Sequence, residues 1–201
     1  MIAIVDYGAG NLHSVQNALS HLGAETIVSS SRETILRADK IILPGVGSFG
    51  HAMGCLQNAG LCEAMQTAAA TGKPLLGICL GLQLLFESSE ESPGAAGLGI
   101  FRGTFRRIPQ TGGIKIPHIG WNSLEMAKPS RILNGLSKDP YVYFVHSYYL
   151  EADNPADVSA YTTYGTRLAV AAERDNVFAV QFHPEKSGET GLKILENFIE
   201  L

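Results

Sequence analysis

The chain has 201 residues, of which 45% are hydrophobic and 17% charged, a length and composition typical of one globular domain spanning residues 1–201. Nineteen acidic residues exceed fifteen basic ones, and the net charge of −4 argues against nucleic acid as a partner. No apolar run is long enough to cross a bilayer and no signal peptide is recognisable, so we expect a cytoplasmic protein without a membrane anchor.

Short apolar runs rich in β-branched residues alternate with helical patterns in the first half of the chain. Leu12, Val15 and Leu19 recur at helical spacing within residues 11–22, and Ser30 with Glu33 resembles a capping box that begins the next helix. This alternation predicts an α/β fold, an open, doubly wound and mostly parallel sheet of flavodoxin-like type. The expected strands are 2–5, 25–28, 40–43 and 74–78, and a further helix is expected over 61–70.

The second half of the chain contains strand patterns that follow one another closely, which predicts additional, mainly antiparallel or mixed, strands. A last helix over 189–201 carries Leu192, Leu195 and Phe198 at core-facing spacing. The segment 87–97, rich in Ser, Glu, Gly and Ala, is expected to be a surface loop. The expected strands are 99–108, 116–125, 141–146, 158–164, 168–173 and 177–182.

Cys79 lies where an apolar strand runs into a helix, with Gly77 and Gly81 two residues away on either side. This pattern is that of a nucleophile elbow with cysteine in place of serine. The helix N-terminus favours a thiolate, and the N–H of Leu80 is placed to receive a developing oxyanion. An isolated cysteine is more often a buried core residue, but the flanking glycines favour the nucleophile.

A thiolate nucleophile needs a base, and the strand pattern over 177–182 ends in His183-Pro184-Glu185. In an extended segment the side chains of His183 and Glu185 point the same way, so the carboxylate can orient the imidazole. Pro184 is expected to keep the segment extended. A surface turn is the alternative, but the carboxyl ends of parallel strands meet at one sheet edge, which favours a site shared with Cys79.

A third element, Pro44-Gly45-Val46-Gly47, follows the strand that begins at Lys40. Glycines allow the backbone to turn N–H groups toward a ligand, so Val46 and Gly47 are candidates to complete an oxyanion hole with Leu80. Taken alone the pattern is also that of an ordinary turn.

The cysteine elbow, the His-x-Glu pair and the Pro-Gly loop, in this chain order, resemble the class I glutamine amidotransferases. Within this class, the glutaminase subunits of imidazole glycerol phosphate synthase are similar to this chain in the segments 4–12, 118–122 and 144–148. They are also similar in the loop, which reads Pro-Gly-Val-Gly where many other relatives have Pro-Gly-Gly. The resemblance implies hydrolysis of L-glutamine by Cys79, His183 and Glu185 without a cofactor or metal. It also implies that Gln83, Ser147 and Tyr148 line the glutamine pocket.

The same resemblance implies that ammonia passes to a (β/α)₈-barrel cyclase subunit in a heterodimer that serves histidine biosynthesis. Asn11, Trp121, Tyr143 and Lys186 are the candidate interface residues by this resemblance, and ordinary surface and core positions are the alternative.

Several other interpretations are set aside. Gly8-Ala9-Gly10 lacks the third glycine and the acidic residue of a dinucleotide-binding turn. His51 and Cys55 share a helical spacing without a further metal ligand, so both are interpreted as packing residues, and no role is assigned to Cys62. A cysteine peptidase-like hydrolase is an alternative that assays of glutamine against small peptides would distinguish. A non-catalytic subunit of the same fold is another; the intact Cys79, His183 and Glu185 argue against it, and a thioester trapped by a glutamine analogue would exclude it.

Overall fold

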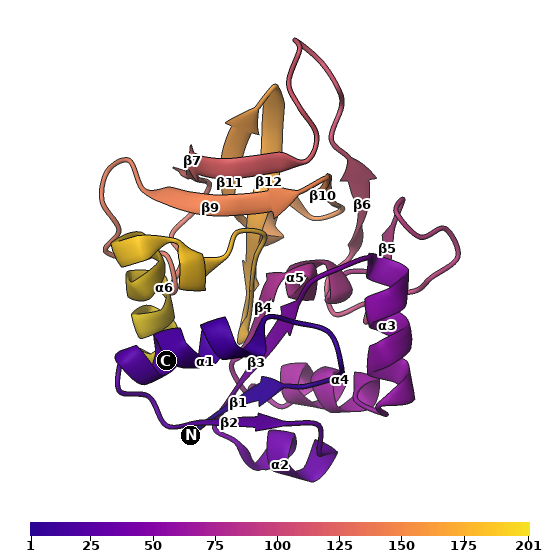
Figure 1. Cartoon of the computed structure of the whole chain (residues 1–201), viewed down its shortest axis with the longest axis vertical. Helices are drawn as coiled ribbons and strands as arrows, with labels where there is room; N and C mark the ends of the chain where they lie inside the picture. The colour runs from indigo at the N-terminus through magenta and orange to yellow at the C-terminus, as the bar shows by residue number, and fades with distance from the viewer.

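A mixed sheet of eleven strands forms the centre of the molecule, in a computed structural model that describes residues 1–201 (Figure 1). Neighbouring strands follow the order β2-β1-β3-β4-β13-β12-β10-β6-β5, with β11 paired to β12 and β8 paired to β11. The parallel part comprises β2 (Thr26–Ser29), β1 (Ile2–Val5), β3 (Lys40–Gly45), β4 (Leu75–Cys79) and β13 (Val177–Val180). The antiparallel extension comprises β12 (Thr166–Arg174), β10 (Tyr148–Ala152), β6 (Gly103–Arg107), β11 (Val158–Tyr164) and β8 (Glu125–Met126), and the short β5 (Ser88–Ser89) runs parallel to β6. The predicted fold class is confirmed.

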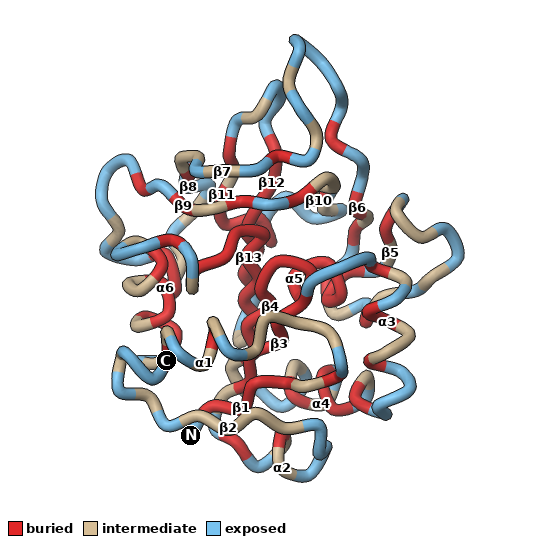
Figure 2. The backbone as a smooth tube through the Cα atoms, viewed as in Figure 1, coloured by how far each residue is buried: buried red, intermediate tan, exposed pale blue.

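Helices cover both faces of the parallel strands because successive apolar side chains point to opposite faces. Ile2 and Ile4 pack in one core with buried residues of α1 (Leu12–His21) and α6 (Gly188–Glu200). Ala3 and Val5 pack in the other core, which includes α2 (Arg32–Arg37), α3 (Phe49–Asn58), α4 (Cys62–Ala70) and α5 (Leu80–Leu84). Figure 2 shows the buried backbone concentrated along β4, β13 and β12, between these layers. None of the helices has the length and apolarity needed to span a membrane.

A second, two-stranded sheet pairs β7 (His118–Ser123) with β9 (Tyr141–His146) in antiparallel register, and it lies over β11 and β12 in the view of Figure 1. Its strands alternate between a buried and a solvent-facing side. The buried side carries His118, Val142, Phe144 and His146. The other side, here called the outer face, carries Ile119, Trp121, Tyr141, Tyr143 and Val145. Four of these five side chains are at least 37% exposed, so the sheet presents apolar groups to solvent.

Several local expectations differ from the structure. Helix α2 is capped by Ser31, whose hydroxyl accepts a hydrogen bond from Thr34 N at 3.4 Å, rather than by Ser30. The run 116–125 is divided into β7 and β8, and the strand expected over 99–108 begins only at Gly103. The segment 87–97 lies at the surface, as expected, but it is also bonded to the start of α3, because Phe49 N donates to Glu91 Oε2 at 2.7 Å. Helix α3 and strand β10 lie outside the sequence prediction. Strand β10 has no distinctive apolar period, whereas Phe49, Ala52, Met53 and Leu56 of α3 recur at helical spacing, a signal that the sequence contains.

Candidate active site

Cys79 occupies a strained turn between β4 and α5. Its φ of 56° and ψ of −110° lie in a region that non-glycine residues rarely adopt. The turn passes so close to β3 that a Cβ at Gly81 would overlap the carbonyl oxygen of Leu43, and a Cβ at Gly77 would lie 2.7 Å from Gly81 O. The two glycines are therefore required by packing around the elbow. Cys79 itself is 8% exposed.

His183 reaches the same sheet edge on the neighbouring parallel strand. β13 pairs with β4 so that Val180 lies opposite Ile78, and the chain beyond Val180 therefore leaves the sheet beside Cys79. His183 Nδ1 lies 2.8 Å from Glu185 Oε1, and the two side chains are only 3% and 1% exposed. The contact between the two side chains is thus present in the structure.

The backbone that makes this contact differs from the extended one we expected. Strand β13 ends at Val180, and Pro184–Lys186 form a 3₁₀ turn, η2. Proline fixes φ near −65°, a value that suits the first position of a helical turn as well as an extended chain. The segment is held by bonds to β9, since His183 N donates to Tyr143 O at 3.0 Å and Tyr143 N donates to Ser187 Oγ at 3.0 Å.

Burial and two neighbours set the charge of His183. Burial lowers its pKa, whereas the Cys79 thiol and the Glu185 carboxylate raise it, and the net effect is a pKa of about 9. Nε2 is buried and makes no hydrogen bond of good geometry, although the Cys79 sulfur is close enough to affect its pKa. With Nδ1 engaged by Glu185, Nε2 is left as the atom that exchanges a proton with a reacting group.

This raised pKa predicts how stability changes with pH. Between pH 6.5 and 9 the folded state holds a proton on His183 that the unfolded state has lost, so the free energy of unfolding falls as pH rises. The fall attributable to His183 is on the order of 3 kcal/mol across this window. Urea unfolding at several pH values measures it. The slope should flatten in His183→Asn and persist in the matched variant His13→Asn, because His13 is exposed; equal slopes in both variants would contradict the assignment.

A cavity of about 410 Å³ opens at this sheet edge. It gathers most of the residues singled out from the sequence, including the nucleophile candidate, its base and the three oxyanion candidates. The predicted lining residues present are Val46, Gly47, Cys79, Leu80, Gln83, Ser147, Tyr148, His183 and Lys186. The cavity thus brings the Cys79 thiol, the His183 imidazole and the backbone of a glycine loop around one space.

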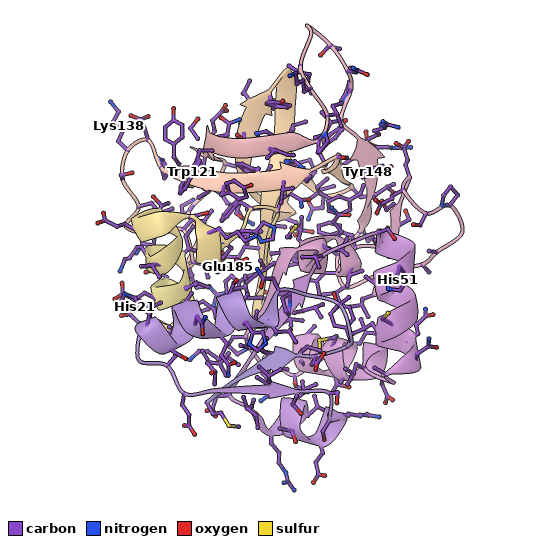
Figure 3. The ribbon with its side chains drawn as sticks, viewed as in Figure 1. His21, His51, Trp121, Lys138, Tyr148 and Glu185 are labelled. Atoms are coloured by element: carbon purple, nitrogen blue, oxygen red, sulfur yellow. The ribbon has the colours of Figure 1, made fainter.

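The remaining predicted residues lie around this cavity rather than in it. Glu185 lies behind His183, in a narrow gap that Asn11 also lines. Trp121 and Tyr143 belong to the outer face of the β7–β9 sheet, with ring centroids 6.2 Å apart. Figure 3 shows Trp121 on the ribbon of this sheet and Glu185 between the sheet and α1. Tyr143 connects the two regions, because its backbone binds His183 and Ser187.

Five residues of the cavity lie outside the sequence prediction: Glu91, Pro117, Val145, His146 and Gln181. Gln181 Nε2 lies 3.8 Å from Cys79 Sγ and Gln181 Oε1 accepts from Gln83 Nε2 at 3.2 Å. Val180 lies opposite Ile78, so extending this pairing by one residue places Gln181 beside Cys79. A parallel pairing of the two expected strands could therefore have predicted Gln181. Glu91 enters from the 87–97 segment, and His146 enters from β9. Nothing in the local sequence distinguishes Glu91 from the other acidic residues around it.

Two other features of the surface carry no such chemistry. A larger hollow of about 640 Å³ lies at residues 126–137 beside Glu173, but Lys128 and Arg131 there are already bonded to Glu173. His51 Nε2 lies 3.6 Å from Cys55 Sγ on α3, as their spacing suggested. His51 is exposed, however, so its interpretation as a packing residue is wrong. No group of three or more His, Cys, Asp or Glu side chains is arranged to hold a metal ion.

A family model described as glutamine amidotransferase class-I matches residues 3–201 of the chain. The chain belongs to this family. It is 51% identical over 201 residues to the imidazole glycerol phosphate synthase subunit HisH of Methanothermobacter thermautotrophicus, covering 100% of this chain and 98% of the relative. It is also 51% identical over 202 residues to the protein of the same name from Acaryochloris marina, covering 100% of this chain and 94% of the relative.

Solved structures share the fold at lower identity. A glutamine amidotransferase crystal structure superposes with a TM-score of 0.76 at 21% identity, covering 98% of this chain and 99% of the other. The structure of PurLQS from Thermotoga maritima superposes with a TM-score of 0.74 at 20% identity, covering 99% of this chain and 97% of the other. The architecture of the family is therefore preserved at identities that leave substrate and partner unspecified.

Proposed function

We propose that this chain is the glutaminase subunit of an imidazole glycerol phosphate synthase, hydrolysing L-glutamine to L-glutamate and ammonia. One observation carries the proposal. Cys79 lies in a strained strand-to-helix turn, and the adjacent parallel strand delivers His183, with Glu185 bonded to Nδ1, to the same cavity. Relatives about half identical over the whole chain that bear the name of this subunit support the biological assignment.

The catalytic cycle needs only groups of this chain. The Cys79 thiolate attacks the side-chain amide carbon of glutamine, and N–H groups near Val46, Gly47 and Leu80 stabilise the oxyanion. His183 Nε2 gives its proton to the leaving nitrogen, so the C–N bond breaks and ammonia departs, leaving a glutamyl thioester. Water then attacks the thioester while His183 takes its proton, and breaking the C–S bond releases glutamate and restores the thiolate.

The charges of the cavity suit a zwitterionic amino acid. Glu91 is the carboxylate on its wall and Lys186 the ammonium group, which fit the α-ammonium and α-carboxylate of glutamine respectively. Gln83 Oε1 is buried without a hydrogen-bond partner, which leaves an acceptor available to a donor such as an amide NH₂. Ser147 and Tyr148 complete the wall on the β9–β10 side.

The ammonia acceptor lies on a second protein in this proposal, a (β/α)₈-barrel cyclase that forms imidazole glycerol phosphate and an aminoimidazole carboxamide ribotide in histidine biosynthesis. The outer face supports a docking surface beside the cavity, because Ile119 is 58% and Trp121 55% exposed. Exposed Val46 and Lys186 line the cavity and add to this apolar and charged surface. A large exposed apolar patch with polar or charged groups at its rim is typical of a protein–protein interface.

The interface assignment predicts that Trp121→Ala weakens binding of the cyclase by roughly 30-fold or more, since a buried interface tryptophan is worth about 2 kcal/mol or more. Lys186→Glu should weaken it as well, through reversed charge. Met126→Ala is the matched control, because Met126 is 43% exposed on β8 outside the outer face. Titration calorimetry with the purified cyclase measures these affinities, and wild-type affinity for both Trp121→Ala and Lys186→Glu would remove this face from the interface.

The decisive experiment for the proposed activity is an assay of glutamate release from glutamine, with a panel of small peptides as competing substrates, for the chain together with the cyclase. Selective hydrolysis of glutamine supports the glutaminase. Hydrolysis of peptide bonds would favour a cysteine peptidase-like enzyme, and no hydrolysis of either would favour a non-catalytic subunit.

A further inference from the structure

Two buried histidines outside the Cys79, His183 and Glu185 group lie on the inner side of the β7–β9 sheet. His118 and His146 are opposite each other in the strand register and are 2% and 5% exposed. His118 Nδ1 lies 3.0 Å from His146 Nε2. Their neighbours in sequence, Ile119 and Val145, pair on the outer face. The two imidazoles therefore lie directly beneath the proposed partner surface.

The hydrogen-bond partners fix where the protons are. His146 Nδ1 lies 2.9 Å from Tyr148 O, and a carbonyl oxygen only accepts, so Nδ1 carries the proton. In a neutral ring His146 Nε2 is then an acceptor, and His118 Nδ1 must donate to it. His118 Nε2 is left as an acceptor, facing Asn122 Nδ2 at 3.4 Å. The chain of donors thus runs in one direction, from Asn122 to the Tyr148 carbonyl.

Both ends of this chain are held by backbone. Asn122 Nδ2 also donates to Thr163 O at 3.0 Å, while its Oδ1 accepts from Ser123 N at 2.9 Å, so a flip of the amide would lose both bonds. The His118 ring is packed between Phe144 and Tyr164, with centroid separations of 4.8 Å and 4.0 Å. A reversed chain would require these groups to rearrange together.

The far end of the chain fixes the cavity wall. The Tyr148 carbonyl is bonded to His146, and the Ser147 carbonyl accepts from Ile108 N at 2.9 Å. His146, Ser147 and Tyr148 all line the cavity that contains Cys79. The bond from His146 is therefore one of the contacts that hold the turn between β9 and β10, and His146 is itself held by His118.

We propose that His118 and His146 are positioning residues that connect the outer face of the β7–β9 sheet to the Ser147–Tyr148 wall and hold that wall in place for glutamine. The inference rests on the proposed glutaminase function and deepens it. A partner docked on Ile119 and Trp121 contacts the same strand as His118, so docking acts on the substrate wall through one hydrogen bond between imidazoles.

The neutral state of His118 and His146 also helps His183 to keep its proton for the proposed reaction. Burial lowers the pKa of His118 to about 4 and that of His146 to about 3, with the charge of His183 contributing at His146. His183 is the imidazole that carries a positive charge during the cycle. A second buried imidazolium beside it would lower its pKa and weaken its ability to hold a proton for the leaving nitrogen.

Paired variants of His118 test the proposal in the complex with the cyclase. His118→Leu removes the donor and leaves His146 Nε2 unsatisfied, whereas His118→Asn keeps an N–H close to the position of Nδ1. We expect the KM for glutamine to rise roughly tenfold in His118→Leu, with a smaller change in kcat, and to be largely restored in His118→Asn. Ammonia-dependent synthesis should be unchanged in both. His51→Leu is the control, because His51 is exposed on α3.

Nitrogen-15 NMR of the histidine-labelled chain gives a second readout that does not require glutaminase activity. Both His118 and His146 should show the Nδ1–H tautomer, and His118→Leu should shift the His146 Nε2 resonance. An Nε2–H tautomer at His146 would overturn the inference. So would equal KM values for His118→Leu and His118→Asn, provided that the wild-type complex hydrolyses glutamine. Absence of glutamine hydrolysis by the wild-type complex, with the expected tautomers present, would instead refute the proposed function.

Discussion

Replacing Cys79 with alanine is expected to lower glutamine hydrolysis by a factor on the order of 10⁵ to 10⁶, the scale on which a covalent nucleophile contributes. The substitution removes the sulfur that attacks the amide and keeps the Cβ, so the strained backbone at φ 56° is the same in both proteins. The fold should therefore persist, and synthesis from added ammonia should continue because that reaction bypasses the thioester. Glutamate release and ammonia-dependent product formation by the same complex measure the two effects.

Cys55→Ala is the matched control for this experiment. Cys55 is a free, half-buried thiol on α3 that does not line the cavity, so its loss should leave both reactions unchanged. Glutaminase activity in Cys79→Ala within tenfold of wild type would rule out Cys79 as the nucleophile. Equal losses of glutamine-dependent and ammonia-dependent synthesis would indicate a folding or docking defect instead.

The parallel half of the fold could be predicted from the sequence because its strands are buried on both faces and therefore appear as uninterrupted apolar runs. Such runs identify β1, β3, β4 and β13. The helical patterns between the early strands imply a parallel sheet with helices on both faces. The antiparallel half carries less information in its local pattern. Strand β10 contains Tyr148, Tyr149 and Glu151 at mixed burial, so neither strand period nor helix period distinguishes it.

In the candidate site, too, the residues that follow parallel strands could be predicted, whereas contacts made by loops could not. Cys79 and His183 could be placed together because each follows a strand of the parallel sheet, and that rule depends on topology alone. Contacts made by loops did not follow from the sequence. The 3₁₀ turn at Pro184 depends on bonds from β9 to His183 and Ser187, and the position of Glu91 depends on its bond to Phe49 N. These bonds join residues that are distant in the sequence, so they are decided by packing rather than by local preference.

The glutaminase of the isolated chain is expected to be slow and to rise by roughly a hundredfold to a thousandfold when the cyclase docks with its own substrate bound. The loop at Val46 and Gly47 is the reason. Its start is fixed, because Tyr7 Oη donates to Pro44 O at 2.8 Å and Gly45 pairs with Cys79 across the sheet. Its end is fixed as well, because Glu91 and Ser92 accept from Phe49 N and Gly50 N.

Only the short exposed stretch between these anchors is free to reorient, and Gly47, at φ +96°, supplies the freedom. A peptide there that turns its C=O toward the cavity removes one oxyanion donor and places an acceptor against developing negative charge, whereas the flipped peptide donates. Exposed Val46 lines the cavity, and a partner that contacts it can favour the donor state by binding that state more tightly. Steady-state rates for the chain alone, with cyclase, and with cyclase plus acceptor substrate test this account. Equal rates in all three would mean that the oxyanion hole is already formed in the isolated chain, and that the anchors at Tyr7 and Glu91 hold the donor state without help.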